Sequence, residues 1–151
     1  MIKFAMAVLF LSLTFQVQAV GLGNIFGALM GKSGSQGHEK SVDDALIKVS
    51  ALMNKKMPVI IDKDTRLDKV SAEPGQHLKY HYTLVGVRNG DVNIVEFSKA
   101  IKPQLKSRLC ENIEMQKFLK SGVSISYLYR GNDGRAIGGA EFSPSDCGYK
   151  T

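Results

Sequence analysis

The chain has 151 residues, two cysteines and no tryptophan, and its formal net charge is +6 at pH 7. This length predicts one globular domain that buries its own core. The positive charge favours acidic partners, but the lysines alternate with acids and no basic run is interleaved with aromatic residues. Nucleic acid is therefore not an expected partner.

The first 19 residues have the pattern of a signal peptide. Lys3 precedes a mostly apolar run from Phe4 to Phe15, and Val17-Gln18-Ala19 fits a small-x-small cleavage site. The apolar run has about 12 residues, whereas a membrane-spanning helix needs roughly 20. We expect cleavage after Ala19, export to the periplasm or the medium, and no lipid anchor, since no cysteine adjoins the cleavage site.

Residues 20–40 are rich in glycine and serine, and they predict a flexible leader. Gly23, Gly27 and Gly31 stand four apart, which is the spacing that lets helices approach each other closely in membranes. The alternative is therefore a short helix that makes peripheral contact with a membrane or docks on a partner through an apolar face of Ile25, Phe26, Leu29 and Met30. The cost of so many glycines in a helix favours the leader.

Residues 41–151 form the expected single domain. A capping sequence at Ser41 opens a helix that runs to about Lys55 and ends before Pro58. Residues 59–61 predict a short buried run, and residues 62–70 a charged edge strand. After a Pro-Gly turn, alternating residues 78–84 predict a half-buried strand.

The histidines of this strand do not predict a metal site. His77 and His81 share its polar face, but Lys79 lies between them and no third ligand is evident.

A helical period follows in Phe97, Ile101, Leu105 and Leu109. Pro103 interrupts it, so the helix either begins near Lys102 or kinks at the proline.

The rest of the chain predicts a second helix and a hairpin. The helix ends at Gly122, a strand follows from Val123, and Asn132-Asp133-Gly134 forms a turn into a returning strand that ends near Phe142. Gly138 and Gly139 mark a bulge or a close backbone approach in the returning strand.

Together these elements predict an α+β fold, a mostly antiparallel sheet of four to five strands packed by about three helices. Cys110 and Cys147 have 36 residues between them. In an exported chain, two cysteines predict one structural disulfide. No nucleophile motif, perturbed acid pair or calcium loop is evident, so we expect no enzyme activity, no catalytic residue and no cofactor.

The C-terminal half resembles the small pilotins of the AspS type, which help secretin subunits of type II secretion to reach and assemble in the outer membrane. The resemblance rests on Leu109-Cys110, on Phe118-Leu119 followed by residues 122–127, on Gly134 after an acidic turn, and on Asp146-Cys147-Gly148. Such pilotins are usually lipoproteins, whereas this chain has no acylation cysteine. The resemblance implies the periplasm of a Gram-negative bacterium, a setting also indicated by the likeness of residues 57–84 to uncharacterised exported proteins.

These observations predict a non-enzymatic, periplasmic, protein-binding domain. Its partner is expected to be a secretin or another envelope protein, held as a helix or a strand. The alternatives are a small inhibitor or immunity protein that acts through residues 62–69, and an envelope protein that touches the membrane through its glycine-rich leader. The candidate partner-binding residues are Phe97, Ile101, Leu105, Met115 and Phe118, with core packing as the competing interpretation of each.

Overall fold

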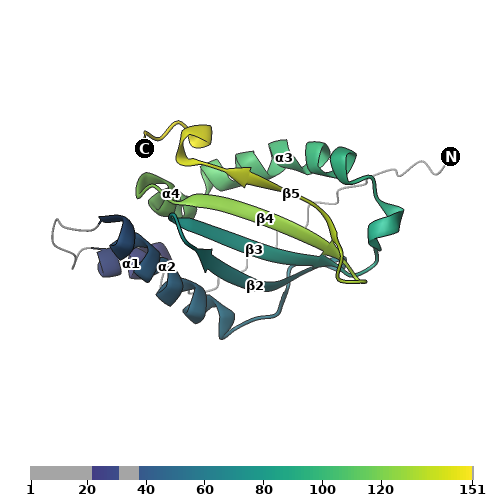
Figure 1. Ribbon diagram of the computed structural model, residues 1–151, viewed down its shortest axis with the longest axis horizontal. Helices are drawn as coiled ribbons and strands as arrows, with labels where there is room; N and C mark the ends of the chain where they lie inside the picture. Colours follow the sequence, from purple (N-terminus) through teal and green to yellow (C-terminus); the bar gives the residue numbers. More distant parts are fainter. Residues whose placement is uncertain (1–21, 31–37, 151) are drawn as a thin grey trace.

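The computed structural model describes residues 22–30 and 38–150, which form one five-stranded sheet with its helices on a single face (Figure 1). The α+β fold and the mostly antiparallel sheet are confirmed. In chain order, the elements are α1 (Leu22–Met30), α2 (His38–Asn54), β1 (Val59–Ile60), β2 (Thr65–Glu73), β3 (His77–Leu84), α3 (Ile94–Glu111), α4 (Ile113–Lys120), β4 (Ser124–Gly131) and β5 (Ala136–Phe142).

The strands lie in the order β1-β2-β3-β4-β5, and all neighbours are antiparallel except β3 and β4. The parallel pair runs from His77 opposite Ser124 to Leu84 opposite Gly131. Parallel neighbours cannot be joined by a tight turn. The long connection between them carries α3 and α4 onto the helical face of the sheet.

The core lies between this face and the helices. Strand side chains alternate, so every second residue points inward, and the helices contribute apolar residues at helical spacing. The most deeply buried side chains are Phe26, Val42, Leu46, Val49, Val70, Leu78, Leu109, Phe118, Leu119, Val123, Ile125, Ile137 and Phe142.

The flexible-leader prediction is wrong for residues 22–30, which form α1. Phe26 is 1% exposed, and its ring centroid lies 4.6 Å from that of Phe118 in α4. Burial of this aromatic pair outweighs the low helix propensity of the glycines. The signal sequence and residues 31–37 lie outside the described residues, and α2 begins at His38, three residues before the expected cap.

Within the described part of the chain, no helix is both long enough and apolar enough to cross a bilayer.

Residues 59–61 are exposed, contrary to the prediction of a buried run. Val59, Ile60 and Ile61 are 37%, 67% and 53% exposed. The reason is topological: β1 is the outermost strand, and β2, expected at the edge, lies inside the sheet. An apolar triplet has the same sequence signature in both positions.

Beyond β1, a side chain covers the edge of β2. The amide of Asn54, at the end of α2, donates to the Val70 carbonyl and accepts from the Val70 N–H, both at 2.8 Å. This side chain replaces the ladder bonds that a longer β1 would make.

Helix α3 is continuous, with Pro103 in its interior. The proline lies on the exposed side, where water can replace the missing N–H donor. At the start of the helix, a Cβ on Gly138 would lie 2.7 Å from the Phe97 ring and 2.6 Å from Ser98 Oγ. This confirms the predicted close approach, which seats α3 against β5.

The predicted disulfide is present between Cys110, at the end of α3, and Cys147, in the short 3-10 turn after β5. It ties the end of α3, in the long connection between β3 and β4, to the turn that follows β5. The loop that it closes spans 37 positions.

Replacing both cysteines by serine should lower the free energy of unfolding by about 3–4 kcal/mol, because the unfolded chain regains the entropy of this loop. Urea unfolding of the wild-type and double-serine proteins measures the difference. If the urea midpoint is unchanged by the substitutions, the disulfide does not contribute the expected free energy of unfolding. Thiol labelling of the denatured, unreduced wild type tests separately whether the bond is present, and we expect no reactive thiol.

Substitution of Asn54 by alanine should destabilise the fold by about 1–3 kcal/mol, because two backbone groups of β2 lose their partners. Asn54→Asp keeps the acceptor for the Val70 N–H but removes the donor to the Val70 carbonyl. Its free energy of unfolding should therefore lie between those of the wild type and the alanine variant. Urea denaturation of all three proteins orders them, and equal stability of the alanine variant and the wild type would refute the role of this side chain.

Candidate functional site

A groove opens on the helical face, between α3 and the connection from β1 to β2. Its volume is about 270 Å³. We call it the tyrosine groove, and its lining residues are Ile61, Asp62, Thr65, Tyr82, Leu105, Arg108, Leu109, Asn112, Met115, Tyr127 and Tyr129.

The floor of the groove is formed by Tyr82, Tyr127 and Tyr129, which belong to a tyrosine ladder on β3 and β4. Tyr80 is part of the same ladder, but it is buried in the core and does not line the groove. The parallel register sets Tyr80 beside Tyr127 and Tyr82 beside Tyr129. Their ring centroids are 5.6 Å and 5.0 Å apart, and both pairs are stacked. Alternate positions on two in-register strands thus build one continuous aromatic surface that points toward the helices.

The phenol groups of this surface remain uncharged. Burial, followed by the neighbouring phenols, raises the pKa of Tyr82 and of Tyr127 far above the ordinary tyrosine value. Burial likewise raises the pKa of Tyr80, whose hydroxyl donates to Met115 Sδ at 3.6 Å. The floor therefore offers apolar rings with neutral hydroxyls, which suits contact with a partner that is itself mainly apolar.

The rim of the groove carries opposite charges. Asp62 belongs to the β1–β2 connection, and Arg108 to the last turn of α3. The Arg108 side chain is exposed and has no ion pair or hydrogen bond with another described residue. It is therefore available to an incoming carboxylate or carbonyl group.

The predicted partner-binding residues are only partly brought together. Leu105 and Met115 line the groove. Phe97 packs edge-on against Tyr129, with ring centroids 5.6 Å apart, and Ile101 is half-buried on α3. Phe118 is 1% exposed beneath Phe26, so it belongs to the core and not to a surface site.

Sequence reasoning missed the groove tyrosines and Arg108. The signal for the tyrosines was present, because three of them occur at alternate positions of predicted strands. The pattern indicated only which face they share. It did not indicate that the helices leave part of that face uncovered.

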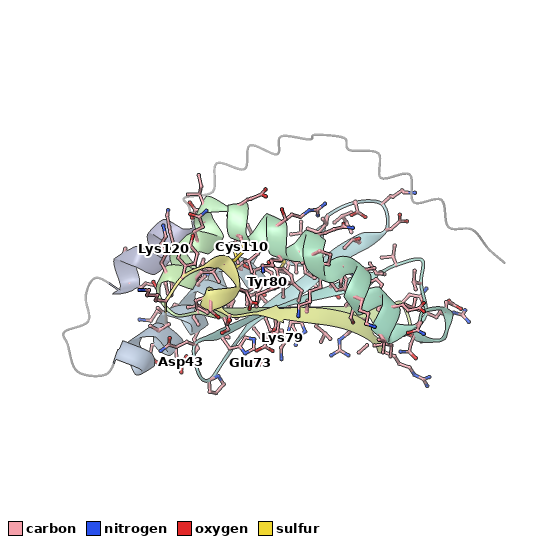
Figure 2. The ribbon with its side chains drawn as sticks, turned by 90° about the horizontal axis from the view of Figure 1, so that it is seen from above. Asp43, Glu73, Lys79, Tyr80, Cys110 and Lys120 are labelled. Carbon is pink, nitrogen blue, oxygen red and sulfur yellow. A yellow bond between two sulfur atoms is a disulfide. The ribbon has the colours of Figure 1, made fainter. Side chains whose placement is uncertain are left out.

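The opposite face of the sheet is polar, and its side chains bond to one another. Lys79 Nζ lies 2.6 Å from Glu73 Oε1, and His77 Nε2 lies 2.6 Å from Ser126 Oγ. Figure 2 shows Glu73 and Lys79 on the side of the sheet away from Cys110 and α3. Within residues 22–30 and 38–150, no three histidine, cysteine or acidic side chains converge as a metal site would require.

His81 on this face should make the fold acid-sensitive. Burial, then the charges of Lys69, Arg130 and Lys79, lowers its pKa below the ordinary value of 6.5. Since the unfolded state binds the proton more readily, stability is highest above the unfolded pKa and is lost as the pH falls through 6.5 toward the folded pKa.

Urea unfolding between about pH 7 and pH 5 should therefore show a smaller loss of stability for His81→Gln than for the wild type. His77→Gln, which removes the other imidazole of β3, is the matched control. Equal slopes for the wild type and His81→Gln would contradict the assignment.

The structure thus defines a class, a small α+β domain with one sheet, helices on one face and a groove between them. The chain belongs to the family named "Domain of unknown function (DUF8479)", whose profile matches residues 41–137. That range contains every residue that lines the groove. No curated protein matches the sequence.

Three solved structures have a similar fold at low sequence identity. The "putative secreted protein (PA3611)" of Pseudomonas aeruginosa has 17% identity and a TM-score of 0.64, over 76% of this chain and 99% of its own. The type 2 secretion pilotin EpsS of Vibrio vulnificus has 11% identity and a TM-score of 0.59, over 75% and 97%. The type II secretion pilotin AspS of Vibrio cholerae has 12% identity and a TM-score of 0.57, over 73% and 95%. At these identities the likeness shows the fold, which extends through the N-terminal half as well as the C-terminal half.

Proposed function

We propose that this protein is an exported, non-enzymatic binding domain that holds a segment of an envelope protein in the tyrosine groove. The observation that carries the proposal is the groove itself, an aromatic floor left open between α3 and the β1–β2 connection. Tyr82, Tyr127 and Tyr129 pack against the core on one side, but each is only partly buried and lines the groove on the other.

The groove favours a partner segment with an apolar ridge. Tyr82, Tyr127 and Tyr129 offer stacked rings, and Leu105 and Met115 add aliphatic wall. Aromatic residues gain large contact area at low entropic cost, so they are the usual anchors of protein interfaces. An amphipathic helix or an extended strand presents such a ridge.

The neighbouring structures support an envelope role. Two of them are type II secretion pilotins, and the signal-like N-terminus and the disulfide fit an oxidising, exported setting. We propose the periplasm as the location and a secretin subunit as the first partner to test. A pilotin-like role without a lipid-bearing cysteine would require the protein to reach the membrane through its partner.

Charge reversal at the groove should weaken binding at least tenfold. Arg108→Glu changes an exposed side chain, so it should leave the fold intact. It leaves two acids on the groove lining, the introduced glutamate and Asp62, and a bound partner would have to desolvate or approach them without the arginine. The matched control is Lys99→Glu, an equal charge change at an exposed position of α3 that does not line the groove.

The measurement is cross-linking in the host envelope, followed by purification and mass spectrometry. We expect a secretin subunit as the main cross-linked partner of the wild type and of Lys99→Glu, with at least a tenfold loss for Arg108→Glu, which corresponds to about 1.4 kcal/mol. Recovery of an exported enzyme in place of a secretin would instead favour the alternative that this protein is an inhibitor of that enzyme. Equal recovery with both variants would refute the groove as the site.

A further inference from the structure

We propose that the tyrosine groove recognises a carboxylate, and that the segment it holds carries an acidic side chain beside its apolar ridge. Arg108 receives this carboxylate together with the hydroxyl groups of Tyr82 and Tyr129. The inference rests on the proposed function, because it specifies the chemistry of the partner at the same groove.

The floor of the groove carries hydroxyl groups that are free to bind a ligand. Tyr82, Tyr127 and Tyr129 form no hydrogen bond with another described residue, whereas the buried Tyr80 donates to Met115 Sδ. Among the described side chains, the polar atom that is both sealed from solvent and without a partner is His81 Nδ1. The three phenol oxygens are therefore accessible, and they open into the groove that their residues line.

Arg108 acts on two of these hydroxyls. Burial raises the pKa of Tyr129, and the Arg108 charge opposes the rise. Burial and the neighbouring phenols raise the pKa of Tyr82, and Arg108 again opposes the rise. Burial is the larger effect, so both phenols stay protonated and keep their O–H donors. The guanidinium adds its N–H donors to the same part of the groove, and an ionised carboxylate accepts from donors of both kinds.

The one acid on the groove lining does not neutralise this site. Asp62 Oδ1 accepts from the Asp64 N–H at 2.8 Å, within the β1–β2 connection, and no ion pair joins Asp62 to Arg108. Asp62 nevertheless acts on the groove, because its charge adds to the effect of burial in raising the pKa of Tyr129. A bound carboxylate is thus attracted to Arg108 and repelled by Asp62, which fixes the end of the groove that it occupies.

The shape and the apolar lining favour an acidic side chain of a peptide segment over a small free anion. A volume of about 270 Å³ holds a carboxylate together with an apolar side chain. A phosphate or a sulfate would meet Arg108 but leave the rings of the floor and the side chains of Leu105 and Met115 uncovered. A segment that carries an acid next to apolar residues fills both parts of the groove.

The test compares two small probes, 3-phenylpropanoate and 3-phenylpropanamide, which share a phenyl ring and differ in charge. Each is titrated into the purified, isotope-labelled protein in about 0.15 M salt, where charges outside the groove are screened. The chemical shifts of the groove residues report binding. We expect the carboxylate to bind about fivefold more tightly than the amide, as one partly exposed charge pair allows.

Variants at the two charges should move this preference in opposite directions. Arg108→Gln should make the two probes bind equally. Asp62→Asn should increase the preference, because it removes the repelling charge but keeps an oxygen that accepts from the Asp64 N–H. Tyr129→Phe keeps the ring, so it should weaken binding of the carboxylate more than binding of the amide. Lys99→Gln, an equal charge change on α3 outside the groove, should behave like the wild type.

The outcomes separate this inference from the proposed function. Equal affinity of the two probes for the wild type, with shifts at the groove residues, would overturn the carboxylate site and leave the groove as an apolar binding surface. An unchanged preference in Arg108→Gln, or no shift in the groove with either probe, would overturn the site as well. The cross-linking comparison of Arg108→Glu with Lys99→Glu decides the proposed function independently.

Discussion

The parallel pairing of β3 with β4 is the constraint on which the rest of the structure depends. Parallel neighbours need a crossover, so the chain between Leu84 and Ser124 must leave the sheet and return on the same side. That crossover is α3 and α4, and it supplies both a wall of the groove and a large part of the core. The same pairing sets the tyrosines of the two strands side by side, so the floor and the wall have one origin.

A second set of contacts fixes how much of the sheet the helices cover. At one end of the sheet, the Asp43 carboxylate of α2 accepts from the backbone N–H groups of Gly75 and Gln76, at 3.2 Å and 2.7 Å, and the stacking of Phe26 on Phe118 adds α1 to the same layer. These contacts hold α1, α2 and α4 together at that end, as Figure 1 shows. The glycines of β5 seat α3 at the opposite edge of the sheet. The tyrosine groove is the part of the helical face that lies between α3 and the β1–β2 connection and is left uncovered.

The sequence predicts the elements that are set by local chemistry. Strand alternation at residues 78–84, the hairpin at Gly134 and the left-handed stop at Gly122, with φ of +77° and +88° at the two glycines, all depend on nearest neighbours. The order of the strands in the sheet does not depend on nearest neighbours. Nothing local distinguishes an antiparallel from a parallel partner for β3, or an inner from an outer position for residues 59–61. The exposure of β1, the groove and the packing of α1 all follow from strand order and long-range contacts, and therefore could not be predicted from periodicity alone.

The groove and the outer edge of the sheet meet in one short segment. Ile61 and Asp62 line the groove, while Ile60, one residue earlier, forms the outer edge of the sheet. The turn that joins them is closed by backbone hydrogen bonds, because the Ile61 and Asp62 N–H groups both donate to the Thr65 carbonyl, at 2.9 Å and 3.3 Å. One wall of the groove is therefore set by the pairing of β1 with β2, whereas the opposite wall is set by the crossover that carries α3.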